Sequence, residues 1–174
     1  MISVRWANIN DIEEMCKVNT QSWLTTYKDI LPKDVLDKRI ASEKTRIINT
    51  KKDLIEHPDN IKLVGLIDDK IVGMCLAGES ETESHKEAGE IYNLYLLEEY
   101  QGFHLGSKMF ERAIIELIKQ GYSDLVLKCI SNNPSCKFYE SRGGKLVEVI
   151  DCNIYGFPIK ENVYFYDNIK RLVK

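Results

Sequence analysis

The chain has 174 residues, of which 44% are hydrophobic, so length and composition predict one folded domain with its own core and exclude an intrinsically disordered protein. The formal net charge of −3 provides no electrostatic attraction for nucleic acid. No apolar run is long enough to span a membrane, and the first residues lack the basic and then apolar pattern of a secretory signal.

The N-terminal third of the chain predicts one strand followed by helices. Residues 2–6 alternate weakly, as a half-buried strand does. Asn10 and Glu13 have the spacing of a helix capping box, and apolar residues then mark one helical face as far as Trp23. Shorter helices are expected over residues 34–38 and 42–55, and the polar run 57–60 predicts a turn.

A β-hairpin is expected next, because two apolar runs at residues 61–67 and 71–77 are joined by the turn sequence Asp68-Asp69-Lys70. The segment 78–89 is polar and rich in Glu and Ser. We therefore expect it to be a flexible loop.

The stretch 90–121 organises the rest of the chain. Residues 90–97 are apolar and aromatic, which favours a strand. From Leu105 to Ile118 the apolar residues recur with helical spacing, and Gly121 follows as a natural stop. Between them lies a loop with Gly102 and Gly106. Because a helix N-terminus carries unpaired N–H groups and a partial positive charge, this loop predicts a phosphate site.

The remaining chain predicts strands over residues 124–130, 145–150 and 162–166, and a helix over residues 133–141. Together these elements indicate a single α/β domain, residues 1–174, with a central mixed β-sheet flanked by helices. A right-handed crossover should make parallel neighbours of the strands that begin at residues 90 and 124.

The five cysteines and three histidines indicate neither a disulfide framework nor a metal site. The number of cysteines is odd, their spacing is irregular, and no Cys-x-x-Cys pair occurs. The histidines are scattered. We therefore expect a reduced, cytoplasmic protein without a bound metal.

The glycine loop resembles the pyrophosphate loop of the GCN5-related N-acetyltransferase (GNAT) family. The segment reads Tyr100-Gln-Gly-Phe-His-Leu-Gly106, and the pattern of the family is Gln/Arg-x-x-Gly-x-Gly/Ala. Gln101 and Gly106 fit this pattern, whereas His104 stands where the family usually has glycine.

A second motif follows in the order that the family has. Residues 132–143 read Asn-Asn-Pro-Ser-Cys-Lys-Phe-Tyr-Glu-Ser-Arg-Gly, which is similar to the Asn-x-x-Ala-x-x-Phe-Tyr-Glu-Lys-x-Gly segment of that family. The matched positions are Asn132, Phe138, Tyr139, Glu140 and Gly143. The hairpin before residue 90 and the C-terminal strands also fall where the family has them.

The resemblance implies the GNAT-like acyl-CoA N-acyltransferase fold and an acetyl-CoA-dependent N-acetyltransferase. The acetyl group would pass to a primary amine of a small molecule or peptide by direct attack in a ternary complex. The cosubstrate would be acetyl-CoA, and no metal would take part. A non-catalytic acyl-CoA-binding or sensor protein is the alternative that His104 leaves open. Many relatives are dimers, and the aromatic run at residues 164–166 is compatible with a homodimer.

By the same resemblance, three segments would bind the cofactor. Leu94, Tyr95 and Leu96 would pair with the pantetheine like a sheet edge. The pyrophosphate would lie on Gln101, Gly102, Phe103, His104, Leu105, Gly106 and Ser107. The residues near the pantetheine and thiol would be Asn132, Ser135 and Tyr139. Asn132 has the alternative role of capping the helix that follows it.

Three residues would perform the chemistry. The Leu96 N–H would polarise the thioester carbonyl, and Tyr139 would protonate the departing thiolate. An alkylamine has a pKa of about 10.4, so at pH 7 only on the order of one molecule in a thousand can attack and a base is needed. Glu90 is the expected base, acting through a water that Tyr92 holds. The alternatives are a solvated strand-start residue for Glu90 and a core aromatic for Tyr139.

Aromatic residues would line the acceptor pocket: Trp23, Tyr27, Tyr92 and Tyr155. Ordinary core packing is the alternative, above all for Trp23. The acidic loop at residues 79–90 would attract a cationic acceptor such as a polyamine, or is simply solvated. An acyl-cysteine at Cys136 is a further chemical alternative, although no histidine lies near it in the sequence to activate it.

Overall fold

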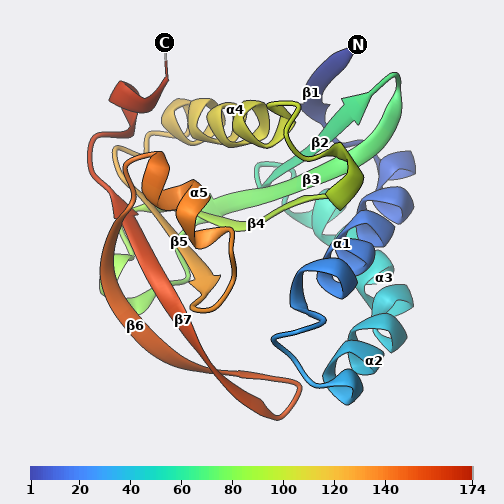
Figure 1. Cartoon of the computed structure of the whole chain (residues 1–174). Coiled ribbons are helices and arrows are strands. Elements are labelled where there is room, and N and C mark those ends of the chain that lie inside the picture. The colour runs from blue at the N-terminus through green and yellow to red at the C-terminus, as the bar shows by residue number, and fades with distance from the viewer. Residues whose placement is uncertain (174) are drawn as a thin grey trace.

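A mixed sheet of seven strands forms the centre of the computed structural model, which describes residues 1–173 (Figure 1). The strand order is β1-β2-β3-β4-β5-β7-β6. The bounds are β1 Ile2–Trp6, β2 Ile61–Ile67, β3 Lys70–Glu79, β4 Gly89–Leu96, β5 Leu125–Ile130, β6 Lys145–Ile154 and β7 Phe157–Tyr166. The β4 and β5 strands are parallel and every other neighbouring pair is antiparallel, which confirms the predicted mixed sheet.

Helices cover both faces of this sheet (Figure 1). Their bounds are α1 Ile12–Tyr27, α2 Lys33–Ala41, α3 Glu43–Glu56, α4 Leu105–Lys119 and α5 Cys136–Ser141. Helix α1 packs with α2 and α3 on one side, and α4 packs with α5 on the other. None of the helices in the described part of the chain is long and apolar enough to cross a membrane.

The α4 helix forms where its apolar periodicity predicts it. The side chains of that face are all buried: Leu105, Met109, Phe110, Ala113, Ile114 and Leu117. The helix lies close to β2, because a β-carbon on Gly65 would come within 2.6 Å of the Met109 sulfur. Gly121 ends the helical segment with a φ of 97°, a conformation that glycine adopts without strain.

The two parallel strands stay paired only at their beginnings. Residues 89, 90 and 91 of β4 pair with residues 125, 126 and 127 of β5. Beyond that point β4 continues to Leu96 and β5 to Ile130 without pairing to each other. Since β4 still pairs with β3 over this part, one edge of β4 faces the gap between the strands. This gap contains the candidate site.

Several local predictions differ from the structure. The capping box at the start of the first helical segment uses Asn8 and Asp11, not Asn10 and Glu13. The α5 helix begins at Cys136 instead of residue 133, because the Asn133 side chain accepts a hydrogen bond from the Ser135 N–H and forms a turn there.

The C-terminal strands form one long hairpin, and β6 and β7 extend to the turn at Tyr155 and Gly156. Tyr164 and Tyr166 are 0% and 1% exposed, so they belong to the core and are not available as a dimer surface. The apolar side chains that are exposed here lie on the edge strand β6: Leu146, Val147 and Val149.

Candidate active site

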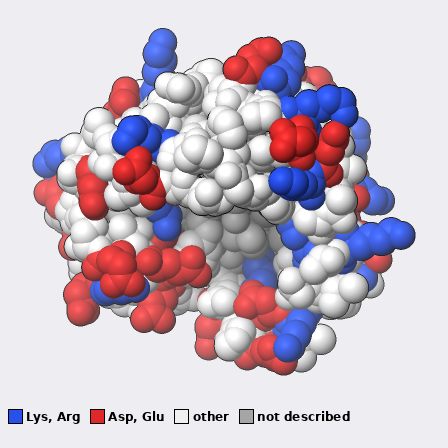
Figure 2. Space-filling view, turned by 90° about the horizontal axis from the view of Figure 1, so that it is seen from below, with Lys and Arg blue, Asp and Glu red and all other residues white. Residues whose placement is uncertain are grey.

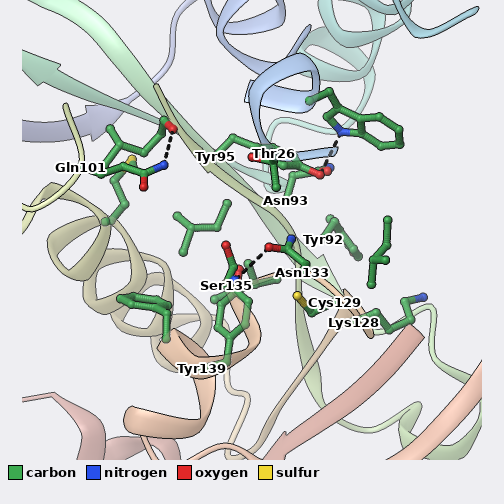
Figure 3. A pocket seen from close by; sticks show the side chains of 18 of the residues that line it. Thr26, Tyr92, Asn93, Tyr95, Gln101, Lys128, Cys129, Asn133, Ser135 and Tyr139 are labelled. Atoms are coloured by element: carbon green, nitrogen blue, oxygen red, sulfur yellow. Dashed lines mark hydrogen bonds between the residues drawn. The ribbon is translucent and has the colours of Figure 1, made fainter. Parts of the chain in front are cut away.

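A cavity of about 520 Å³ lies between the diverging ends of β4 and β5 (Figure 3). Its walls come from α1, β4, the loop that opens α4, β5, the turn before α5, and the C-terminal hairpin. Most of the residues expected to bind the cofactor line it: Leu94, Tyr95, Leu96, Gln101, Gly102, His104, Gly106, Ser107, Ser135 and Tyr139. Three expected residues do not line it: Phe103, Leu105 and Asn132.

The molecule is hollowed on the face where α2 and the β6–β7 turn lie (Figure 2). Uncharged side chains line most of the hollow, and acidic side chains gather along part of its rim.

The β4 wall offers backbone groups to a ligand. In an antiparallel ladder, alternate residues turn their N–H and C=O groups toward the partner strand, and the others turn them away. Because β5 has diverged, the outward groups of residues 92–96 face the cavity instead of another strand. The Gln101 side chain donates to the Leu96 carbonyl at 3.3 Å and ties the end of β4 to the glycine loop.

The loop that follows places a helix N-terminus at the cavity. Gly102 and His104 both have left-handed backbone conformations, with φ of 86° and 61°. The first turn of α4 contains no acidic residue, so no side-chain carboxylate competes there for its N–H groups. Phe103 points outward and is 55% exposed, whereas the Leu105 side chain is fully buried beneath the loop.

The left-handed conformation of His104 is one that glycine adopts without strain, as the resemblance to a glycine-containing loop implied. A side chain in that region costs about 1–2 kcal/mol, although His tolerates it better than most residues. His104 is exposed, so its ring does not fill the loop. The backbone path of a glycine loop is therefore preserved with a histidine in it.

A cation that the sequence analysis did not identify lies beside this loop. Arg142, after α5, donates from Nη2 to the Ser107 hydroxyl and from Nη1 to a Glu111 oxygen at 3.2 Å. Its guanidinium lies 5.3 Å from the centre of the Phe138 ring. Arg142 therefore places a guanidinium, paired with Glu111, beside the start of α4.

Tyr139 reaches the cavity from α5 and is 8% exposed. Its ring packs against Phe110 and Phe138. Burial is the largest cause of a pKa raised well above the ordinary value of tyrosine, so the hydroxyl keeps its proton at neutral pH. The ring of Tyr139 therefore belongs to the core, as the alternative expected, and the residue also lines the cavity.

The predicted role of Asn132 requires a correction of position. Asn132 is exposed and does not line the cavity, whereas its neighbour Asn133 is buried and does. The Asn133 amide donates to the Tyr27 hydroxyl at 3.2 Å, and its oxygen accepts from the Ser135 N–H at 2.8 Å. The turn that these bonds fix directs Asn133, and not Asn132, inward.

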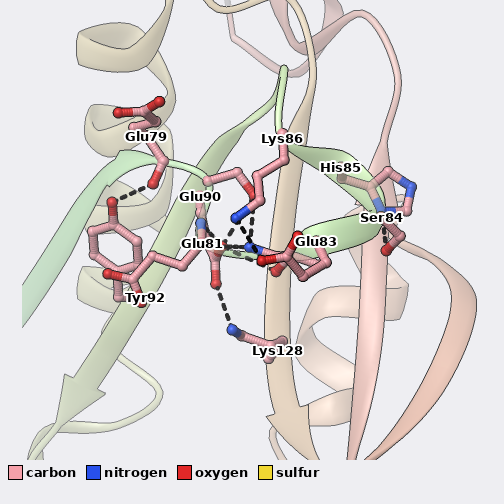
Figure 4. A network of polar contacts seen from close by, with 11 residues as sticks. Glu79, Glu81, Glu83, Ser84, His85, Lys86, Glu90, Tyr92 and Lys128 are labelled. Carbon is pink, nitrogen blue, oxygen red and sulfur yellow. Dashed lines mark hydrogen bonds and ion pairs between the residues drawn. The ribbon is translucent and has the colours of Figure 1, made fainter.

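Glu90 has a different environment from the one expected of a base (Figure 4). It is 1% exposed and does not line the cavity. One carboxylate oxygen accepts hydrogen bonds from the Ser80 hydroxyl, the Glu81 N–H, and the N–H and hydroxyl of Thr82, at 2.8 to 3.2 Å. The other lies 3.2 Å from the Lys128 ammonium. These contacts hold residues 80–82 against the sheet, within the segment 78–89 that we predicted to be a flexible loop.

Tyr92 is also held by the fold. It lines the cavity, but its hydroxyl donates to the Glu79 carbonyl rather than standing free beside Glu90 (Figure 4). Residues 91 and 93 pair with consecutive residues of β3, so Tyr92 is the extra residue of a bulge. This bulge interrupts the alternation on which the shared face of Glu90 and Tyr92 was predicted.

Two charged residues that the sequence analysis missed line the cavity, Lys128 on β5 and Glu161 on β7. Glu161 is half-buried, and it is the only carboxylate that lines the cavity in the described part of the chain. A lysine inside an otherwise apolar strand was the signal that could have identified Lys128. Glu161 lies opposite Ile130 in the β5–β7 ladder, which the sequence alone does not reveal.

Aromatic residues of α1 form the wall opposite α5. Trp23 donates to the Tyr95 hydroxyl at 2.9 Å, and its ring centre lies 4.8 Å from that of Tyr27 in an edge contact. Both line the cavity, as predicted for the acceptor pocket, and both are largely buried. Tyr155 does not line the cavity, because the β6–β7 turn places its hydroxyl beside that of Ser42, between α2 and α3.

The cysteines near the cavity are buried thiols. The Cys136 sulfur lies 3.3 Å from that of Cys129, and Cys129 rather than Cys136 lines the cavity. Burial is the largest cause of the raised pKa of Cys129. A raised pKa keeps this thiol protonated and therefore poorly nucleophilic. No group of His, Cys, Asp and Glu side chains among residues 1–173 has the geometry of a metal site.

Comparison with known proteins gives consistent matches. The sequence model of the acetyltransferase (GNAT) family matches residues 19–144. An uncharacterized N-acetyltransferase of Bacillus subtilis (strain 168), YuaI, is 31% identical over 169 residues, which cover 92% of this chain and 90% of that protein.

Solved structures share the fold at low sequence identity. PaiA N-acetyltransferase from Thermoplasma acidophilum, in complex with coenzyme A, has a TM-score of 0.77 at 20% identity and covers 96% of this chain and 99% of its own. YncA, a putative acetyltransferase from Salmonella typhimurium with its cofactor acetyl-CoA, has a TM-score of 0.66 at 18% identity, covering 96% of this chain and 94% of its own.

Proposed function

Because this chain belongs to the GNAT family of acetyltransferases, and is thus an acetyl-CoA-dependent N-acetyltransferase, we propose that it acetylates a primary amine of a small molecule or peptide in the cavity between β4 and β5. The observation that carries the proposal is the divergence of these strands beside the N-terminus of α4. The amine attacks the thioester directly, with both substrates bound.

The cofactor binds along β4 and across the start of α4. Its pyrophosphate lies on the N–H groups of residues 101–107, where no acidic side chain opposes it in the first helical turn and the Arg142 guanidinium, which also pairs with Glu111, donates to the Ser107 hydroxyl. The pantetheine runs along Leu94, Tyr95 and Leu96 and pairs with the outward backbone groups of Leu94 and Leu96. Support for this placement comes from PaiA and YncA, which hold coenzyme A and acetyl-CoA in the same fold.

The thioester is activated at its oxygen and at its sulfur. The Leu96 N–H donates to the carbonyl oxygen as negative charge develops there. Tyr139, protonated because burial raises its pKa, gives its proton to the departing thiolate. An acyl-cysteine intermediate is not needed, and the raised pKa of Cys129 disfavours one.

The proton of the ammonium acceptor passes to Glu161, directly or through one water. Glu161 replaces Glu90 in this role, because the oxygens of Glu90 are already occupied by the segment 80–82 and by Lys128. Support for Glu161 is its position, as the only carboxylate along the cavity wall in residues 1–173. An anionic side chain there also attracts a cationic amine before the reaction.

The test is to mix the protein with acetyl-CoA and a panel of primary amines, including amino acids, polyamines, aminoglycosides and short peptides. Release of free thiol that depends on the amine, with the mass of an N-acetylated product, is the expected result. Tight binding of coenzyme A without turnover of any amine would instead favour the acyl-CoA sensor.

Tyr139→Phe separates the acid role from a packing role. The variant keeps the ring that packs on Phe110 and loses the hydroxyl, so we expect kcat to fall by about a hundredfold or more while coenzyme A binds with unchanged affinity. Isothermal titration and initial rates measure the two quantities. A parallel loss of rate and affinity would remove Tyr139 from the chemistry.

A further inference from the structure

A second cavity, of about 290 Å³, adjoins the candidate active site. It lies between α1, α2, α3 and the β3–β4 part of the sheet. Trp23 and Asn93 line both cavities, so they form the shared wall. A molecule that occupies the second cavity can therefore extend past these two residues toward the first.

The charges of this cavity are all positive. Arg39 and Arg46 line it, and no acidic side chain of the described chain does. The other arginines each form an ion pair with a carboxylate: Arg5, Arg112, Arg142 and Arg171. Arg39 and Arg46 have no such partner among residues 1–173.

Uncharged groups hold the two guanidinium groups beside each other. The Asn19 side-chain oxygen accepts from Nη2 of Arg39 and from Nη1 of Arg46, the latter at 3.2 Å. Arg46 also donates to the Thr20 hydroxyl at 2.5 Å and to the Ser42 hydroxyl at 3.2 Å. Because both groups are positive and the acceptor that they share is neutral, this contact neutralises neither charge.

One donor of this pair remains unused. The Nε–H of Arg39 is buried and has no hydrogen-bond partner within residues 1–173. Burial, followed by the charge of Arg39, lowers the pKa of Arg46. The charged and titratable groups that act on Arg46 besides Arg39 are Glu43, Cys16 and Tyr155, and each offsets the shift only in part. A buried donor without an acceptor and two unneutralised cations both indicate that an anion completes the site.

Arg39 lies at the boundary between the second cavity and the candidate active site. Its guanidinium carbon lies 4.4 Å from the centre of the Trp23 ring, on the wall that the two cavities share. The Tyr155 hydroxyl accepts from Nη1 of Arg39 at 3.5 Å, so the β6–β7 turn contacts the same group. Although burial raises the pKa of Tyr155, its hydrogen bonds with Ser42 and Arg39 and the charges of Arg39 and Arg46 together lower that pKa.

We propose that Arg39 and Arg46 bind a carboxylate of the acetyl acceptor, so that the acceptor is an amino acid or a closely related amine that carries a carboxylate. This inference rests on the proposed acetyltransferase function. A guanidinium presents paired N–H donors that match the two oxygens of a carboxylate. The carboxylate occupies the second cavity, and the amine passes Trp23 and Asn93 to reach Glu161 and the thioester.

The experiment compares acceptors that differ only in their carboxylate. The common L-amino acids, β-alanine and 4-aminobutyrate are each assayed against their carboxamides, with saturating acetyl-CoA. We expect kcat/KM to favour the acid of the best pair by about tenfold or more, as for loss of a charged hydrogen bond. The length of the preferred ω-amino acid also measures the span between the arginines and the reacting carbon.

Substitutions test whether the arginines cause the preference for acids over carboxamides. Arg39→Gln should abolish it through a rise in KM for the acid alone, and Arg39→Lys should retain part of it. The KM for acetyl-CoA should not change, and the rates with carboxamides should fall far less than those with the acids. Arg171→Gln is the matched control, because it removes an exposed arginine that pairs with Asp167 near the C-terminus. Carboxamides acetylated as well as acids, or a preference that survives in Arg39→Gln, would overturn the inference.

A binding measurement keeps this inference separate from the proposed function. If no amine is acetylated, the proposed function fails, and thermal unfolding with the same acids and carboxamides then tests the arginine pair by itself. A rise in Tm with acids alone, lost in Arg39→Gln, would support the site. If the acids changed neither turnover nor Tm, the carboxylate site would be rejected.

Discussion

At the scale of single residues, Glu161 differs from the other carboxylates in being placed along the cavity. Its backbone lies opposite Ile130 in the β5–β7 ladder, and its side chain is half-buried. By contrast, every oxygen of Glu90 has a partner in the fold. The place of Glu161 along the cavity wall is what makes proton transfer to it feasible.

Glu161→Gln tests this assignment, because the amide keeps the shape of the side chain but cannot accept the proton. We expect kcat/KM for the amine to fall about a hundredfold, with coenzyme A binding unchanged. Initial rates with the best acceptor measure the loss. Asp151→Asn is the control, since it removes an exposed carboxylate of β6 that pairs with Lys160. Rates within threefold of wild type in Glu161→Gln would show that another group or bulk water takes the proton.

Residue identities were predictable from the sequence where a short motif fixes them. Tyr139 and Gln101 line the cavity as the motifs implied. The prediction of Asn132 was wrong by one position. A turn stabilised by the side chain of Asn133 decides which of the two asparagines points inward. Lys128 and Glu161 could not be predicted as a pair of lining residues, because they come together only through the pairing of β5 with β7.

At the scale of elements, the segment 80–88 shows how one buried carboxylate orders a polar loop. Ser80 and Thr82 are buried, and their donors converge on the Glu90 carboxylate. The composition of the segment predicted flexibility, because nothing in a run of Glu and Ser reveals that a strand residue beyond it supplies the acceptor. Long-range hydrogen bonds therefore overrode a local compositional signal.

We expect Glu90→Gln to weaken this element rather than the chemistry. The substitution removes the charge that compensates Lys128 and turns one acceptor into a donor, so the free energy of unfolding should fall by about 2–4 kcal/mol. Chemical denaturation measures this loss, and hydrogen exchange should show faster exchange in residues 80–88. Glu83→Gln, whose exposed carboxylate pairs with Lys86, is the control. A large loss of kcat at unchanged stability would restore Glu90 as the base.

The α4 helix illustrates the opposite case, in which local pattern and tertiary structure agree. Its apolar face and its glycine stop were both readable from spacing, and its start lies at the cavity, where the sequence predicted a phosphate site. The unpredicted part is the conformation of His104, which takes the left-handed backbone that the loop requires despite having a side chain. The loop geometry therefore depends on its hydrogen bonds and packing more than on glycine at this position.

At the scale of the whole molecule, the proposed function depends on where β4 and β5 diverge. The β2–β3 hairpin and the parallel pair were predictable from the sequence of elements, but the length of the β4–β5 pairing was not, since register between distant strands has no local signal. The same applies to the second cavity, which forms only when α1, α2 and α3 close over the sheet. Its two arginines belong to α2 and α3 and carry no motif.

The central claim is that acetyl-CoA binds with its thioester in the gap between β4 and β5, and a crystal structure of the protein with coenzyme A tests it most directly. The decisive quantity is the distance from the coenzyme A sulfur to the Tyr139 hydroxyl oxygen. We predict a distance of about 3–4 Å, with the pantetheine alongside Leu94, Tyr95 and Leu96 and the pyrophosphate at residues 101–107. A pantetheine outside this gap, or a sulfur far from Tyr139, would contradict the account.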